Sequence, residues 1–316
     1  MIARRLPWAR YQRIEDRCTA EDAATPTTWG TPQLKSSGAL ISQPQVGGSS
    51  EAIWKPLFER AQDTKRANVV CMKWGTRYGP EWVNRLAAMV RRNTTWNIRF
   101  VCFTDDPIGI RPDIECHPMP VVEFDPKLGR HWPKLGLFQK NLGGLEGMTL
   151  YLDLDVVVIG SLDPFFAYPG RFCMVREWKD PHLGYGNSSV VRYFIGLESA
   201  VLDRFYATSP EQIASIYACK EQNFLTRAVD EVTFWPDEWC PAFSRACLPR
   251  TRILRYFCKP SRPASGRILV FYGSITPASA MLGEHDPKKR SRVGRIPRLT
   301  RYRFLPAEWI GEYWRE

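Results

Sequence analysis

The sequence lacks the marks of several large protein classes. No apolar run reaches the ~18–20 residues that a membrane-spanning helix needs. No apolar core follows the N-terminal arginines, as it would in a secretory signal. The 9 cysteines are scattered without a C-x-x-C pair, which argues against a disulfide framework and against a zinc site. These absences favour a cytoplasmic location.

Acidic residues are too few to balance the basic ones. Lysine and arginine together number 44, against 33 aspartates and glutamates, which gives a net charge of +11. No helix-turn-helix, zinc-finger or RNA-binding signature accompanies this charge, so nucleic acid is not expected as a partner. Much of the excess lies in two terminal clusters, within residues 4–17 and 288–303. Such basic tails would allow peripheral contact with an anionic membrane, on its inner face.

The length of 316 residues suits one large α/β domain or two small ones. Residues 19–50 are rich in Thr, Ser, Pro, Gly and Gln, and have too little apolar surface to order themselves. We therefore predict a disordered, basic, low-complexity extension over residues 1–60 and a single domain over residues 61–316.

Apolar patterns in the domain alternate between strand and helix. Residues 68–73 form an apolar run of β type, residues 81–92 carry apolar residues at helical spacing, and residues 99–103 form the next strand. This β-α-β order implies a parallel sheet. Further strands are predicted at residues 149–159, 172–176, 188–193 and 268–272, and further helices at residues 134–139, 197–206 and 211–220. The fold class is therefore α/β with a mainly parallel central sheet.

Two carboxylates, Asp153 and Asp155, interrupt the nearly continuous apolar run of residues 149–159. On a strand, residues i and i+2 lie on the same face. Burying two unpaired like charges there is costly, and a divalent cation removes that cost. Carboxylate oxygens suit Mn²⁺ or Mg²⁺, which commonly complete their shell with substrate phosphates. The pair therefore predicts a metal site for the departure of a diphosphate.

Two other interpretations of the pair remain open from the residues alone. The carboxylates could lie at a strand end in solvent, or pair with Lys or Arg. Alternatively, a phosphatase of the haloacid dehalogenase type would use Asp153 as nucleophile and Asp155 as general acid. Such enzymes place the pair on the first strand of the fold, whereas a β-α-β unit precedes it here. The sequence also lacks a later Asp-Asp pair to complete such a site.

Short motifs follow one another around the Asp pair. Lys134 lies before it, residues 160–166 (GSLDPFF) follow it, and Asn187-Ser188-Ser189, Glu221-Gln222 and residues 270–273 (VFYG) come later. In this order the motifs resemble retaining GT-A glycosyltransferases similar to glycosyltransferase family 8, and still more a set of bacterial hypothetical glycosyltransferases of that type. The resemblance covers residues 67–315.

The resemblance implies a GT-A fold and a hexosyltransferase. The enzyme would transfer a hexose from a nucleoside diphosphate sugar, UDP-linked, to a glycan, lipid or protein acceptor with retention of configuration. It implies that Asp153 and Asp155 bind the metal and that Asn187 and Gln222 act at the reacting face. The remaining residues that it assigns to the donor are Lys134, Asp153, Ser188, Ser189 and Glu221.

Two tyrosines complete the prediction. Tyr78 follows the first strand, where the carboxyl ends of parallel strands seat a nucleotide, and it would stack on the nucleobase or pack in the loop. Tyr272 stands where the resemblance implies a histidine ligand to the metal. A neutral phenol, with a pKa near ~10, is a poor ligand for Mn²⁺ or Mg²⁺. A catalytically weak homologue that binds nucleotide sugars therefore remains an alternative.

Overall fold

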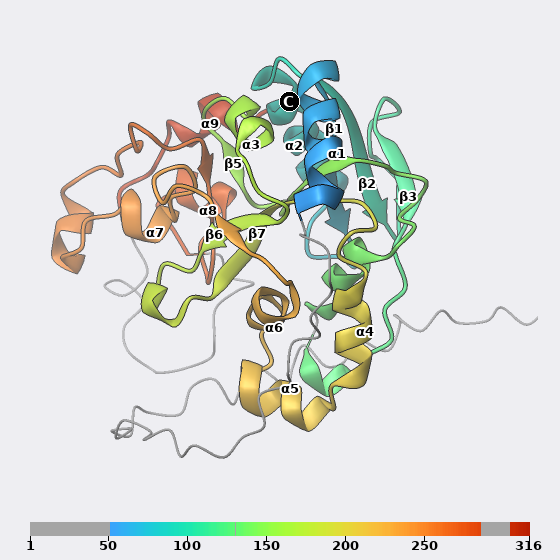
Figure 1. Ribbon diagram of the computed structural model, residues 1–316. Helices are drawn as coiled ribbons and strands as arrows, with labels where there is room; N and C mark the ends of the chain where they lie inside the picture. Colours follow the sequence, from blue (N-terminus) through green and yellow to red (C-terminus); the bar gives the residue numbers. More distant parts are fainter. Residues whose placement is uncertain (1–50, 130, 286–303) are drawn as a thin grey trace, which may run out of the picture.

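The computed structural model describes residues 51–129, 131–285 and 304–316 (Figure 1). Helix α1 (Glu51–Thr64) opens the described chain and buries Trp54 and Ala61. Its Trp54 ring lies 6.3 Å from the Phe194 ring, and the side chain of Gln62 donates a hydrogen bond to the carbonyl of Phe166 at 2.7 Å. The predicted boundary at residue 60 was therefore wrong, because residues 51–60 belong to the folded domain. Residues 1–50 of the predicted extension lie outside the described residues.

The main sheet contains seven strands in the order β3-β2-β1-β4-β7-β6-β8. The pairs β1–β2, β1–β4, β2–β3 and β6–β8 are parallel, whereas β4–β7 and β6–β7 are antiparallel. This confirms the prediction of an α/β fold with a mainly parallel sheet. The strands span Arg66–Lys73 (β1), Asn97–Thr104 (β2), Glu115–Pro118 (β3), Met148–Leu152 (β4), Cys173–Arg176 (β6), Gly186–Phe194 (β7) and Thr233–Phe234 (β8).

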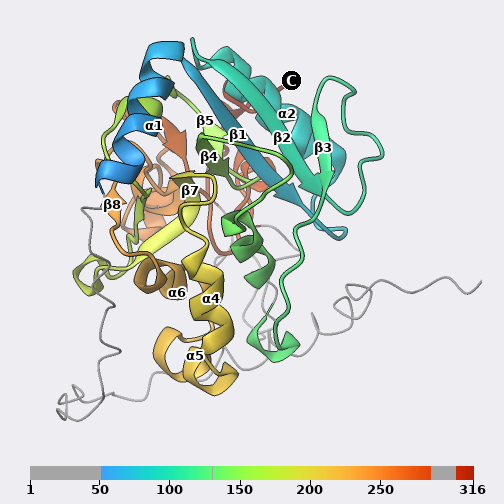
Figure 2. The same cartoon turned by 45° about the vertical axis from the view of Figure 1, so that its right-hand side comes forward.

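Side chains alternate between two buried faces of this sheet. In β1, Val69 and Cys71 enter one core, and Val70 and Met72 enter the other. Helices α1 and α2 (Pro80–Arg92) contribute to the first core. The second core takes side chains from the 3-10 helix η3 (Trp132–Phe138), α4 (Ala200–Ala207) and α6 (Glu221–Ala228). Figures 1 and 2 show α1 and α2 apart from α4, α5 and α6. The predicted helices at residues 81–92, 197–206 and 211–220 correspond to α2, α4 and α5 (Pro210–Tyr217).

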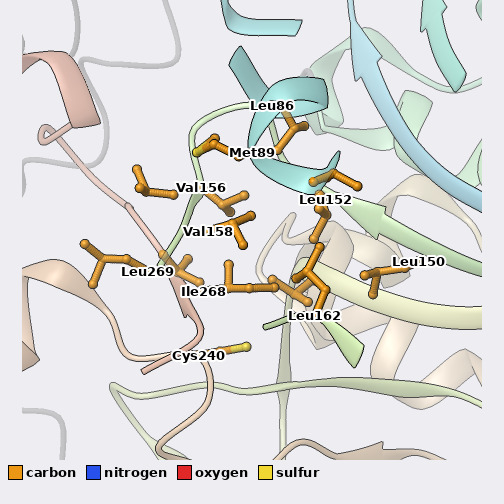
Figure 3. Close-up of a cluster of buried hydrophobic side chains, with 14 of the residues drawn as sticks. Leu86, Met89, Leu150, Leu152, Val156, Val158, Leu162, Cys240, Ile268 and Leu269 are labelled. Carbon is orange, nitrogen blue, oxygen red and sulfur yellow. The ribbon is translucent and has the colours of Figure 1, made fainter. Parts of the chain in front are cut away.

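The apolar run of residues 149–159 is not a single strand, contrary to the prediction. Strand β4 ends at Leu152, a turn follows, and β5 (Val157–Val158) pairs with β9 (Ile268–Leu269) in a separate two-stranded sheet. The run is continuously apolar because both segments are buried, each in its own sheet. Figure 3 shows the core that joins them, where Val156 and Val158 lie near Leu86 and Met89 of α2. Asp153 and Asp155 consequently lie in the turn between the two sheets.

The remaining helices surround the sheets, and in the described part of the chain none is long and apolar enough to cross a membrane. They span Pro126–Leu128 (η2), Asp163–Ala167 (α3), Pro181–Leu183 (η4), Phe243–Ala246 (α7), Arg252–Tyr256 (η5), Pro277–Met281 (α8) and Ile310–Tyr313 (α9). Strands β1, β2, β4 and β6 end at the edge of the sheet where the antiparallel β7 begins. The segments that follow these strands therefore meet at one edge.

Candidate active site

The start of β7 lies directly beside the Asp153 turn. Leu152 of β4 pairs with Val190 of β7, and one residue further the backbone N–H of Asp153 donates to the carbonyl of Ser189 at 2.9 Å. The predicted segment Asn187-Ser188-Ser189 is thereby fixed next to the acidic turn by backbone pairing. All three of its side chains are buried.

Lys134 reaches the turn from η3. Its Nζ lies 2.9 Å from Asp153 Oδ1 and 3.1 Å from Ser188 Oγ, and the residue is 7% exposed. Burial alone would lower the pKa of Lys134, but Asp153 and Glu221 outweigh it and raise the pKa above its ordinary value. Lys134 is therefore a charged, buried lysine inside an acidic environment. Trp132 in the same 3-10 helix is fully buried, which anchors η3 in the second core.

Asp153 is held by two donors on one oxygen. Besides Lys134, the hydroxyl of Tyr151 donates to Asp153 Oδ1 at 2.5 Å. Burial alone would raise the pKa of Asp153, but Lys134 and the hydrogen bond from Tyr151 together bring the pKa below its ordinary value. The Asp153 carboxylate is thus ionised, and the Lys134 ammonium group compensates its negative charge. Tyr151 was not predicted as a site residue, because it stands within an apolar run; its place two residues before Asp153 is the available signal.

Asp155 has a different partner. The hydroxyl of Tyr78, in the loop after β1, donates to Asp155 Oδ2 at 2.7 Å, and the Tyr78 ring packs against Trp82 at 4.6 Å. Burial, and then the charge of Asp155, raise the pKa of Tyr78, so this phenol stays protonated. The structure therefore places Tyr78 at the predicted edge but adds a hydrogen bond to the acidic turn that the sequence did not indicate.

Glu221 is linked to the Lys134 ammonium group through the hydroxyl of Ser188. Ser188 Oγ, which receives a hydrogen bond from Lys134, donates to Glu221 Oε2 at 3.2 Å. Glu221 is 5% exposed, and its second oxygen, Oε1, has no hydrogen-bond partner among the described residues. Burial raises the pKa of Glu221, and Lys134 offsets this only in part. A buried carboxylate oxygen without a donor is a ready acceptor for a ligand hydroxyl.

Gln222, the residue after Glu221, belongs to a chain of side-chain hydrogen bonds that also includes Asn187 and Glu177. Asn187 Nδ2 donates to Gln222 Oε1 at 3.2 Å, and Gln222 Nε2 donates to Glu177 Oε2 at 2.9 Å. Asn187 Oδ1 accepts from the backbone N–H of Ser189 at 3.0 Å, which orients its amide. Glu177 was not predicted. It directly follows β6, so a search for polar residues after each strand of this edge would have found it.

Tyr272, which stands where the resemblance implies a histidine ligand, contacts an aromatic ring and an arginine. Its ring stacks on Trp178 at 5.7 Å, and its hydroxyl oxygen accepts a hydrogen bond from Arg245 Nε at 3.1 Å. Within the residues that the structure describes, no group of three or more His, Cys, Asp or Glu side chains is arranged to hold a metal ion. Asp153 and Asp155 are the two carboxylates of the turn that could contact a divalent cation.

Comparisons with known proteins concern the fold. No protein-family model matches the chain, and no curated protein matches it significantly. Among solved structures it is similar to the galactosyltransferase LgtC, at 14% identity over 66% of this chain and 88% of that chain, with a TM-score of 0.44. The glycosyltransferase GlyE of Streptococcus pneumoniae is 14% identical over 78% of this chain and 60% of that chain, with a TM-score of 0.48. Mouse xyloside xylosyltransferase 1 is 12% identical over 65% of this chain and 97% of that chain, with a TM-score of 0.39.

The structure brings the predicted site residues together at this one edge of the sheet. They come from segments far apart in the sequence, namely Tyr78, Lys134, Asp153, Asp155, Asn187, Ser188, Ser189, Glu221 and Gln222. The two basic clusters predicted to contact a membrane, within residues 4–17 and 288–303, lie outside the described residues.

Proposed function

We propose that the chain is a glycosyltransferase that transfers a hexose from a nucleoside diphosphate sugar, UDP-linked, to a glycan, lipid or protein acceptor. The observation that carries this proposal is the buried group of Lys134, Asp153, Ser188 and Glu221 at the carboxyl edge of the parallel strands. Ligands of α/β folds bind at this edge. The group joins one lysine to two carboxylates and a hydroxyl, which are polar groups suited to a charged, hydroxyl-rich donor.

The acidic turn would serve the diphosphate. Asp153 and Asp155 would hold Mn²⁺ or Mg²⁺ together with the substrate phosphates, and the bound ion would neutralise charge as the diphosphate leaves. Lys134 keeps Asp153 ionised and in place, because its ammonium group compensates the buried carboxylate. Tyr78, as a protonated donor, fixes the orientation of Asp155.

The hydrogen-bonded chain of Asn187, Gln222 and Glu177 would serve the sugar and the reacting face. Glu177 accepts from the Nε2 group of Gln222, which leaves the carbonyl end of the amide directed toward Asn187. The unpartnered Oε1 of Glu221 would accept a hydroxyl of the hexose. Retention of configuration follows from the resemblance of these motifs to retaining enzymes.

The phosphatase is not favoured. Such enzymes place the Asp pair on the first strand of the fold, whereas β1, β2 and β3 precede β4 here. A second candidate does keep support from the site, namely a catalytically weak protein that binds nucleotide sugars. The hydroxyl of Tyr272 is engaged by Arg245, and the described residues lack a third metal ligand.

Turnover distinguishes these candidates. The full chain would be incubated with a panel of nucleotide sugars, with and without Mn²⁺, and release of the nucleoside diphosphate measured. We expect hydrolysis of at least one UDP-sugar. We also expect a loss of about 10²-fold in Asp155→Asn, and no change in the control Asp203→Asn, whose side chain is exposed on α4. Binding without release would favour the weak homologue. Release of phosphate from an aryl phosphate, with no action on any nucleotide sugar, would overturn the proposal.

A further inference from the structure

One segment of the chain carries positive charge without any acid. Residues 239–283 contain no aspartate or glutamate, whereas their basic residues are Arg245, Arg250, Arg252, Arg255, Lys259, Arg262 and Arg267. Most of these lie in or beside η5 and the loop that precedes it. This group of basic residues is separate from the two terminal basic clusters, and it lies in the described, folded part of the protein.

The same segment exposes large apolar side chains. Ile253 is 65% exposed, Leu254 45% and Phe257 76%. Burying a side chain of this size is worth about 1.5–3 kcal/mol, so three adjacent ones left in water are unusual for a monomer. In Figure 1 the orange segment that follows α7 runs at the periphery of the molecule. These side chains therefore have no covering element within the described residues.

The segment is held in place by its own hydrogen bonds. Arg255 Nε donates to the carbonyl of Pro249 at 2.8 Å, and the carbonyl of Arg255 accepts from the N–H of Leu305 at 2.9 Å. The backbone N–H of Cys258 donates to the carbonyl of Leu254 at 2.8 Å. The exposure of the apolar side chains is thus imposed by a fixed backbone that also ties the segment to the C-terminal part of the chain.

Within the described part of the chain, no acid neutralises the arginines that lie near these apolar side chains in the sequence. Arg245, Arg250, Arg252 and Arg255 form no ion pair with acids among the described residues. Partial burial and the neighbouring Arg252 lower the pKa of Arg255, as expected where like charges crowd. A pocket of about 260 Å³ is lined by Ser244, Arg245, Leu248, Arg250 and Arg255. Its lining has the donors that a phosphate group needs.

We infer that this basic apolar surface, residues 245–262, docks the protein on an anionic lipid bilayer. Ile253, Leu254 and Phe257 enter the boundary between headgroups and acyl chains, while the arginines contact lipid phosphates. An acidic protein or a nucleic acid would use the cations but would leave the apolar side chains unexplained. An anionic bilayer is the partner that accommodates both, since interfacial elements combine bulky apolar residues with Lys and Arg.

This surface adjoins the candidate site. Arg245, which lines the pocket, donates to the hydroxyl of Tyr272, and the Tyr272 ring stacks on Trp178. The residue before Trp178 is Glu177, the partner of Gln222. Contacts and one peptide bond therefore link this surface to Gln222. The inference itself does not depend on the proposed function.

Flotation of the full chain with vesicles tests the inference. One set of vesicles is phosphatidylcholine alone, and the other is phosphatidylcholine mixed with phosphatidylglycerol. We expect binding to the anionic vesicles only, weakened by salt. The double variant Ile253→Ser/Phe257→Ser should bind at least about tenfold more weakly, and Arg250→Gln/Arg252→Gln should also lose about tenfold or more.

Matched controls remove similar groups elsewhere. Ile108→Ser deletes an apolar side chain that is 80% exposed, and Lys127→Gln/Lys140→Gln removes two exposed cations; both should bind vesicles like the wild type. Thermal unfolding checks that every variant is folded. Equal binding to neutral and anionic vesicles, or full binding by the two surface variants, would overturn the inference. So would binding to an oligonucleotide without binding to vesicles. Donor binding measured on the same variants separates this outcome from failure of the proposed function.

Discussion

Replacing Lys134 with methionine removes the buried cation that contacts Asp153 while keeping a side chain of similar length. The Lys134 and Asp153 side chains are 9% and 24% exposed, and their charged atoms lie 2.9 Å apart. Removing one partner of a buried ion pair costs about 3–5 kcal/mol, because the other charge is left uncompensated. Asp153 keeps its hydrogen bond from Tyr151. We therefore expect a loss near the lower end, about 3 kcal/mol of unfolding free energy at neutral pH.

The pH dependence of this loss follows from the sign of each pKa shift. In the wild type the pKa of Asp153 is lowered, so its contribution to stability is present above the unfolded pKa of about 3.9 and fades as the pH falls through the lower folded value. Without Lys134, burial raises the pKa values of Asp153 and Glu221, and the variant loses stability as the pH rises above about 4. The gap between the two proteins should therefore be widest near neutrality and close in acid.

Urea unfolding of both proteins over a pH series measures the gap. Lys55→Met is the matched control. Lys55 pairs with Glu51 at 2.5 Å, but the two side chains are 51% and 59% exposed. Its removal should change stability by no more than about 0.5 kcal/mol. A loss below about 1 kcal/mol for Lys134→Met at neutral pH, or a gap that is the same at every pH, would refute the reasoning.

Two further predictions concern residues outside the site. Glu115 accepts hydrogen bonds from Arg99 at 2.6 and 2.8 Å, and these bonds, with burial opposing them, lower the pKa of Glu115 to about 2. Its contribution is thus present above its unfolded pKa and lost as the pH falls toward 2. Because the side chains of Arg99 and Glu115 are 44% and 37% exposed, solvent screening limits the cost of Glu115→Gln to about 1 kcal/mol. Urea midpoints should converge in acid, and a gap that persists there contradicts the prediction. Gly283 has φ +69° and its added Cβ would overlap the carbonyl oxygen of Phe304, so Gly283→Ala should cost about 2–3 kcal/mol. The control Gly147→Ala, with φ +75° but open space, should cost about 1 kcal/mol in the same thermal unfolding assay; equal losses would exclude the overlap as the cause.

The sequence was sufficient to predict the features that depend on local pattern. The β-α-β unit at the start of the domain was predicted because its apolar spacing changes from strand to helix and back. The edge that holds the site was predicted because polar residues follow buried strands there. The sequence motifs assigned Lys134 and Ser188 to the donor, and the structure places Lys134 Nζ within hydrogen-bond distance of both Asp153 and Ser188.

Other features were set by tertiary packing and were not predicted from the local pattern. The break between β4 and β5 falls inside one apolar run, since burial in two different sheets demands the same residue types as burial in one. Helix α1 directly follows a low-complexity stretch, so Trp54 was not predicted as a buried residue of the domain. Tyr151 looked like a core residue because its ring is buried, whereas its hydroxyl serves Asp153.

We propose that the acidic turn and its neighbours form a site for a nucleoside diphosphate. Calorimetric titration of the full chain with UDP in the presence of Mn²⁺ tests it most directly. The wild type and Asp203→Asn should bind at one saturable site, and Asp155→Asn should bind about tenfold or more weakly. No binding by the wild type, or binding that is the same in Asp155→Asn, would contradict the claim.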